Sequence, residues 1–155
     1  RRCGSFCPNH LLRIKHTKMK FYLIIIFSLA TLLNRAPSDA IIGEYWAEDK
    51  SGKIAVFKCE NKYCGRIIWR KENGKDTKNP DERKRDRDIV VSQFLHDFQY
   101  NADEKKLDGG SLYSFDDGNT YKGKMWLEDS GKTLKMRGYI GFSLMGKTAT
   151  FKRVN

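Results

Sequence analysis

The segment from Ile41 to Asn155 lacks any apolar pattern long enough for a helix, and it has few of the side chains that catalysis or metal binding needs. It contains a single histidine, His96, and two cysteines, Cys59 and Cys64. Metal centres and nucleophilic triads combine several such side chains. The scarcity argues against a metalloenzyme, and we expect no resident metal or cofactor.

The chain also lacks an apolar run of membrane-spanning length. Met19 and Lys20 precede thirteen uncharged residues, 21–33, whereas a spanning helix needs roughly 20. Small residues at Ser38 and Ala40 complete the layout of a secretory signal peptide. We therefore expect residues 19–40 to be removed by cleavage near Ala40, which predicts a secreted or periplasmic protein without stable membrane insertion. A membrane anchor is the alternative.

Residues 1–18 precede the start methionine and are expected to be translated leader or cloning-derived sequence outside the fold. They contain four side chains of zinc-binding type, Cys3, Cys7, His10 and His16. Only two residues separate Cys7 from His10, whereas a zinc finger needs about a dozen between its cysteine and histidine pairs. We expect no metal site there.

The excess of positive over negative charge is small once the first forty residues are removed. They hold seven of the 30 Lys and Arg residues and one of the 19 Asp and Glu residues, so residues 41–155 carry 23 minus 18, a formal +5. The basic residues alternate with acidic ones, as in residues 83–88. This pattern is typical of a solvated surface, and no nucleic-acid partner is expected.

What the segment does contain is a series of short strands separated by turn residues. We predict one all-β domain over residues 41–155, an eight-stranded antiparallel up-and-down barrel. The predicted strands are Ile41–Glu48, Lys53–Glu60, Cys64–Lys71, Ile89–Tyr100, Lys106–Phe115, Asn119–Glu128, Lys132–Ile140 and Gly146–Val154.

The two cysteines are predicted to form a disulfide that staples a hairpin. The four residues between Cys59 and Cys64 suit a β-turn, and cysteines of an exported protein are oxidised. A redox-active pair is the alternative, but that chemistry favours two intervening residues at a helix start. The disulfide is therefore expected to be structural.

The disulfide also predicts which residues face the interior. With Cys59 directly opposite Cys64, Val56 lies opposite Ile67, and the face away from the disulfide is apolar. Alternation along the other strands extends this face. The predicted interior residues are Val56, Ile67, Trp69, Phe94, His96, Phe98, Tyr113, Tyr121, Met125 and Met136. The alternation leaves open whether they line a cavity or form a packed core.

Residues 71–88 are too long and too polar for a hairpin turn. Asn79 as N-cap, Pro80 and the acidic residues that follow predict a short helix from Pro80 to about Arg85. This loop could cover the barrel mouth as a lid or serve as a solvated connector.

No catalytic arrangement is predicted around His96. It is followed by Asp97, and adjacent strand side chains point to opposite faces, so the two cannot form a dyad. Ser92 and Ser111 could approach His96, but no nucleophile-turn motif accompanies them. A protein without enzymatic activity is expected, and a hydrolase is the weakest alternative.

An ordered set of motifs resembles the exported bacterial family called domain of unknown function 2147. The motifs are Gly43-Glu44-Tyr45, Cys59 with Cys64-Gly65-Arg66-Ile67, Asn79-Pro80-Asp81, Asp108-Gly109-Gly110 with Tyr113, Gly118-Asn119-Thr120-Tyr121, Arg137-Gly138-Tyr139, and Gly146-Lys147-Thr148 with Lys152-Arg153-Val154. The resemblance implies a lipocalin-like, calycin-type barrel with no established activity. It further implies that Tyr45 and Arg153 pair to close one end of the barrel.

These predictions combine into two hypotheses about function. In the first, the exported barrel sequesters or carries a small apolar or amphiphilic molecule, which His96 or a tyrosine hydroxyl would orient. In the second, the barrel is filled and the protein binds a protein partner through its outer surface. Out-facing Trp126, near Lys122 and Lys124, and the loop of residues 71–88 would then make the contacts.

Overall fold

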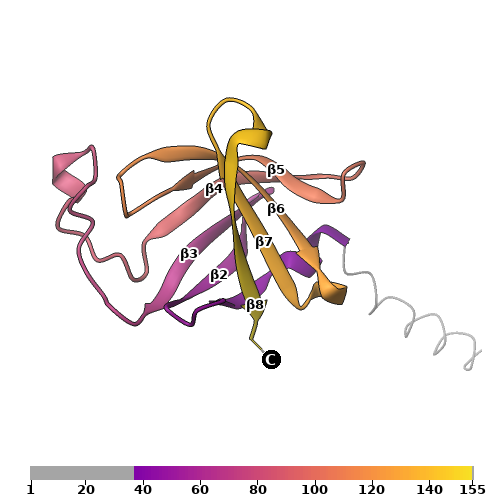
Figure 1. The fold of residues 1–155 in the computed structure, drawn as a ribbon, viewed down its shortest axis with the longest axis horizontal. Helices are drawn as coiled ribbons and strands as arrows, with labels where there is room; N and C mark the ends of the chain where they lie inside the picture. The colour runs from indigo at the N-terminus through magenta and orange to yellow at the C-terminus, as the bar shows by residue number, and fades with distance from the viewer. Residues whose placement is uncertain (1–36, 155) are drawn as a thin grey trace, which may run out of the picture. The chain divides into compact units, whose positions relative to one another are not determined.

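The computed structural model describes residues 37–154, which form a closed antiparallel β-barrel (Figure 1). The strands are β1 (Gly43–Ala47), β2 (Gly52–Cys59), β3 (Lys62–Arg70), β4 (Gln93–Asn101), β5 (Lys106–Tyr113), β6 (Thr120–Glu128), β7 (Thr133–Tyr139) and β8 (Gly146–Arg153). Each strand pairs with its neighbours in sequence, and β8 closes onto β1. The predicted eight-stranded up-and-down barrel is confirmed.

The strands run in alternate directions, so their connections gather at two ends of the barrel. One end carries the 3-10 helix η2 (Pro37–Ile41), the β2–β3 and β4–β5 turns, and the β6–β7 turn with η4 (Asp129–Gly131). We call it the closed end. The other carries the β1–β2, β3–β4, β5–β6 and β7–β8 connections, the last with η5 (Ser143–Met145), and we call it the open end.

The predicted helix in the β3–β4 loop is wrong. The segment contains only η3 (Glu82–Lys84), a single 3-10 turn whose N-cap is Asp81. Asn79 does not cap it, although its buried side chain accepts from the Asp81 amide at 2.9 Å and donates to the Asp76 carboxylate at 2.6 Å. Both bonds form a turn within the loop, and the 3-10 turn begins only after the next capping residue, Asp81.

The predicted register between β2 and β3 is also wrong, by two residues. Val56 lies opposite Gly65 and Ile54 opposite Ile67, because the hairpin turn contains two residues rather than four. Cys59 and Cys64 still form the disulfide, with their Cα atoms 5.9 Å apart. Since Cys64 lies opposite Phe57, the bond runs diagonally across the pair, on the outer face.

Side chains fill the half of the barrel nearest the closed end. Tyr45, Leu95, Phe98, Met125 and Leu134 have no solvent-accessible surface. Two glycines make room for the Phe98 ring, since a Cβ at Gly110 or Gly123 would approach that ring to 2.4 and 2.5 Å.

Two predictions concern residues that the structure does not describe. The leader of residues 1–18, with Cys3, Cys7, His10 and His16, and most of the predicted signal peptide lie outside residues 37–154. Within the described part of the chain, no helix is long and apolar enough to cross a membrane.

Candidate functional site

The strand register places six of the ten predicted interior side chains on the inner face of the barrel. They are Val56, Ile67, Phe98, Tyr121, Met125 and Met136. Four of the six are buried, whereas Ile67 and Tyr121 are only partly buried. The inner face also includes Leu107 and Leu134, and it includes Leu95 and Leu112, which strict alternation along β4 and β5 does not identify.

Trp69 and His96 lie on the outer face, contrary to the prediction. An irregularity in the β2–β3 pairing sets Trp69 opposite Lys53, and its side chain is 42% exposed. His96 lies opposite Ser111, whose partner in β6 is Lys122. The reason lies in β4, where Asp97 has a φ of 63° and acts as an extra residue between two inward positions.

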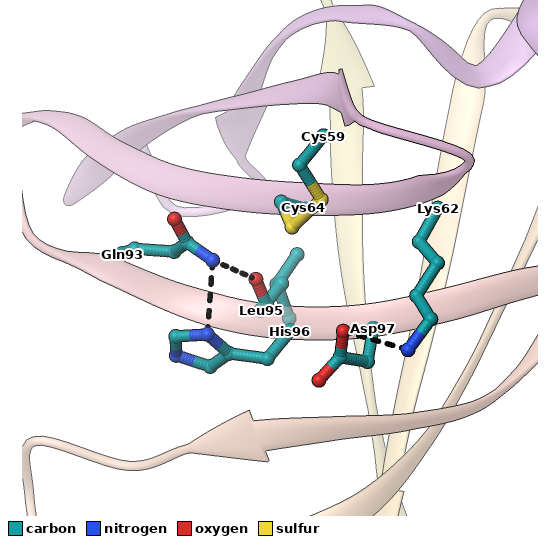
Figure 2. The surroundings of a disulfide bond; sticks show 7 residues. All are labelled: Cys59, Lys62, Cys64, Gln93, Leu95, His96 and Asp97. Carbon is teal, nitrogen blue, oxygen red and sulfur yellow. Dashed lines mark hydrogen bonds and ion pairs between the residues drawn. A yellow bond between two sulfur atoms is a disulfide. The ribbon is translucent and has the colours of Figure 1, made fainter.

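Figure 2 shows the consequence for His96 on the outer surface near the disulfide. Its Nδ1 lies 2.9 Å from the side-chain amide of Gln93, and Asp97 instead pairs with Lys62 at 3.0 Å. His96 is therefore separated from the interior, and it is no candidate for orienting a ligand there. Among the described residues, no three His, Cys, Asp or Glu side chains are grouped to hold a metal ion.

Phe94 and Tyr113 also face outward, and the β3–β4 loop contacts Tyr113. Tyr113 lies opposite the exposed Thr120, yet its own side chain is only 8% exposed. The Tyr113 hydroxyl donates to the Asp76 carboxylate of the loop at 2.8 Å. Phe94 is the next residue along β4 from Leu95, which faces inward opposite Leu112. The two rings thus belong to a second apolar layer outside the barrel.

A buried carboxylate anchors the β3–β4 loop to this layer. Asp76 has no exposed surface and accepts hydrogen bonds from Tyr113, Asn79 and Arg87. The Arg87 guanidinium lies 5.6 Å from the Tyr113 ring centre and 5.7 Å from that of Phe115. Burial and the adjacent Asp76 carboxylate raise the pKa of Tyr113 to about 12. The loop is thus fixed to the rim of the open end by a charged, hydrogen-bonded network.

At the open end, several apolar side chains face inward and still contact solvent. Three of them are cross-strand partners of buried residues: Ile67 of Ile54, Leu112 of Leu95, and Ala149 of Met136. Ala149 is exposed although it faces inward, and the others are partly buried. We call the set the mouth residues: Ile67, Leu112, Tyr121 and Ala149.

The closed end is built around Tyr45 and Arg153, the pair that the family resemblance implies. The Arg153 guanidinium lies 4.7 Å from the centre of the Tyr45 ring and donates to the Tyr45 hydroxyl. It also donates to the carbonyl oxygens of Gly131, Ile42 and Ala40. One side chain thereby joins η2, the β6–β7 turn and the last strand.

The residues that precede the predicted cleavage site contact the barrel. Asp39 of η2 accepts a 2.7 Å hydrogen bond from the Tyr63 hydroxyl and lies 3.4 Å from Lys58 Nζ. Burial, together with the Asp39 carboxylate, raises the pKa of Tyr63. Cleavage after Ala40 would remove these contacts from the mature protein.

Two surface hollows among the described residues also lie at the closed end. The first, of about 180 Å³, is bordered by Ile41, Tyr100 and Trp126 among others, and the second, of about 470 Å³, by Lys58, Tyr63 and Gln99 among others. The first is smaller than sites for drug-sized ligands, and polar side chains make up most of the second. The first hollow is nevertheless partly apolar, because Leu107, Met125 and Leu127 border it.

A comparison with curated proteins found no match. Among solved structures, the barrel is similar to one described as "Protein HP1028 from the human pathogen Helicobacter pylori belongs to the lipocalin family". The two are 28% identical with a TM-score of 0.67, over 74% of this chain and 83% of that one. A family model described as "Uncharacterized protein conserved in bacteria (DUF2147)" matches residues 43–153. The chain therefore belongs to this family, domain of unknown function 2147, and has a lipocalin-like fold.

Proposed function

We propose that this protein binds a small, largely apolar or amphiphilic molecule at the open end of its barrel, and so sequesters or carries it. One observation carries the proposal: the mouth residues face inward, are apolar and keep solvent-accessible surface. A ligand that covers them gains roughly 25 cal/mol for each Å² of apolar surface removed from water. The lipocalin-like fold supports the same class of function.

The filled half of the barrel limits the size and depth of such a ligand. Ile54, Leu95 and Met136 lie beneath the mouth residues and are at most 4% exposed. A ligand would therefore rest on these side chains instead of passing through the barrel. Tyr121 is the polar group best placed to orient it, although its hydroxyl already donates to the Asp117 carboxylate. In this proposal the protein acts after export, with the predicted cleavage near Ala40 and a secreted or periplasmic location.

Substitution at Ala149 tests the site directly, because a larger side chain there occupies the space that the ligand would fill. We expect Ala149→Trp to weaken binding of the fluorescent apolar probe N-phenyl-1-naphthylamine at least about tenfold, equivalent to about 1.4 kcal/mol. The control is Thr148→Trp, which adds the same ring one residue away on the outer face and should leave probe binding unchanged. Equal affinity in all three proteins would refute the site.

A second measurement asks whether the protein carries a natural ligand. Native mass spectrometry would compare protein purified from its host with the same protein after unfolding and refolding in buffer. We expect an additional non-covalent mass in the first sample and not in the second. If no added mass is found and the probe does not bind, the ligand-binding proposal is refuted.

The packing around Phe98 favours a second candidate function, an interaction protein with a filled barrel. Its outer surface carries an aromatic pair, Trp46 and Trp69, whose rings meet edge to face at 5.3 Å. Lys50 and Lys53 lie over the Trp46 ring at 5.3 and 5.7 Å. Aromatic and basic side chains together are typical of binding surfaces for acidic partners. Loss of partner binding in Trp69→Ser, with unchanged probe binding, would support this candidate over the first.

A further inference from the structure

The β7–β8 connection gathers four highly exposed apolar side chains. Ile140, Phe142, Leu144 and Met145 are between 70% and 89% exposed, within six consecutive residues. Figure 1 shows this yellow loop projecting beyond the ends of the strands. Four large apolar side chains gathered at one tip form a patch that water solvates poorly.

The backbone of this loop is held in place by the strand that leads into it. The Arg137 guanidinium donates to the carbonyl oxygens of Ser143 at 2.6 Å and Leu144 at 2.9 Å, and to the Thr148 hydroxyl at 2.8 Å. The Met145 amide also donates to the Phe142 carbonyl at 3.1 Å. Folding the loop down over the barrel mouth would break the Arg137 contacts, so the structure favours a tip that points away from the barrel.

The charges on the β7–β8 hairpin have one sign. Residues 132–155 include six basic side chains and no acidic one. Three of the six, Lys132, Lys152 and Arg153, lie at the closed end, so the basic side chains of the hairpin nearest the tip are Arg137 and Lys147. Lys147 is exposed and lies one residue from the loop, and exposed Lys122 is the cross-strand partner of Tyr139 at its base. The acidic residues of the open end, such as Asp116 and Asp117, belong to other connections.

An apolar tip flanked by Arg137, Lys147 and Lys122 matches the chemistry of an anionic lipid bilayer. Apolar side chains gain by entering the boundary between headgroups and acyl chains, and each Lys or Arg near an anionic surface adds about 1 kcal/mol. A second copy of this chain is a poorer occupant, because two basic hairpins repel each other. We propose that the loop of residues 140–145 inserts its apolar side chains into anionic membranes and attaches the barrel to them peripherally. This attachment does not depend on the ligand site proposed above.

Hydrogen exchange of the full chain, followed by mass spectrometry of its peptides, measures the loop itself. Vesicles of phosphatidylglycerol and phosphatidylcholine in equal parts should slow exchange in the peptide that covers residues 140–146. Vesicles of phosphatidylcholine alone should do so much less, and added salt should weaken the effect because it screens the basic residues. No slowing with the anionic vesicles would overturn the proposal.

Variants distinguish insertion of the tip from other lipid contacts. The apolar run of residues 21–33 is the same in all of them, so a difference in lipid binding comes from the substituted side chains. Phe142→Ser combined with Leu144→Ser should need at least about tenfold more lipid for equal protection, which corresponds to about 1.4 kcal/mol. Both side chains are exposed, so the melting temperature should not change. Tyr100→Ser, at the closed end, is the control and should bind as the parent does. The proposal would be overturned if the double variant and the control showed equal protection of the loop. It would also be overturned if an apolar probe protected the loop in the absence of vesicles.

Discussion

The two ends of this barrel are built from similar strands but differ in how their inward side chains are used. At the closed end, Tyr45 and Phe98 have no exposed surface, and Arg153 joins three separate segments of the chain. At the open end, Ile67 and Ala149 face inward yet remain in contact with water. The comparison teaches that stability is concentrated at one end, which leaves apolar surface available for binding at the other.

The β3–β4 loop modifies this contrast, because the contacts of Asp76 fix the loop to the rim of the open end. Asp76 is as deeply buried as the residues of the closed end, but it lies outside the barrel wall beneath a loop. The open end thus combines a fixed rim with an accessible lining. Four predictions test this division.

Removal of an inward-facing apolar side chain should lower the free energy of unfolding more at the closed end than at the open end. Phe98→Ala should lower the free energy of unfolding by about 4 kcal/mol, because the ring fills the space between Gly110 and Gly123. Ile67→Ala should cost less than about 2 kcal/mol, because Ile67 is already partly hydrated. Urea denaturation measures both values. Similar costs would show that the open end is packed as tightly as the closed end.

The rim should depend on the Asp76 carboxylate. Asp76→Ala should lower stability by about 3 kcal/mol, because it leaves Arg87 and Tyr113 without their shared partner. Asp81→Ala is the control, since it removes the N-cap of η3 and the exposed ion pairs of Asp81 with Arg83 and Lys84, and it should cost about 1 kcal/mol. Thermal unfolding compares them, and limited proteolysis should cut the loop of residues 71–92 faster in the first variant only. Equal losses would mean that the rim is not anchored through Asp76.

Alkaline pH should weaken the same network. The pKa of Tyr113 is raised to about 12 in the folded protein, against about 10 in an unfolded chain. Between these values the folded state keeps a proton that the unfolded state releases, so stability is fully present below pH 10 and is lost as the pH rises toward 12. The loss should be on the order of 1 to 2 kcal/mol. Tyr113→Phe should show a shallower decline in urea midpoint over this range, and a decline equal to that of the parent would contradict the assignment.

The smallest expected effect is a gain in stability at the rim. Val91 has a φ of 68° and is 71% exposed, a backbone conformation that a β-branched residue adopts at a cost. Val91→Asn should therefore stabilise the protein by about 1 kcal/mol, because asparagine tolerates the left-handed region. Its amide would still donate to the Ile67 carbonyl. Val91→Ile keeps the branching and should give no gain in melting temperature, and a gain from both substitutions would rule out backbone strain as the cause.

The number and order of the strands could be predicted from the sequence because alternation and turn residues are local properties. The bulge at Asp97 could not, and it turns His96 outward while Phe98 points inward. The two-residue hairpin turn is similar: Cys59 and Cys64 bond across a diagonal, so their spacing did not reveal the register. The face that alternation assigns to a strand residue is correct only up to the nearest bulge or register shift.

The partners of polar side chains were the other element that sequence reasoning missed. Asn79 and Pro80 have the local preferences of a helix start, but Asn79 instead donates to Asp76. Tyr113 looks like an interior residue until the loop that covers it is known. The role of Asn79 depends on the conformation of its loop, and that of Tyr113 depends on a contact with Asp76, 37 residues earlier in the chain. A periodic pattern in the sequence holds no information about either.

The contact between Arg153 and the Ala40 carbonyl brings the beginning and the end of the barrel together. Both limits of the described chain, η2 and the end of β8, therefore lie opposite the mouth residues. A ligand that reaches the mouth residues, and a membrane that meets the β7–β8 tip as proposed, would both approach the barrel from the other end.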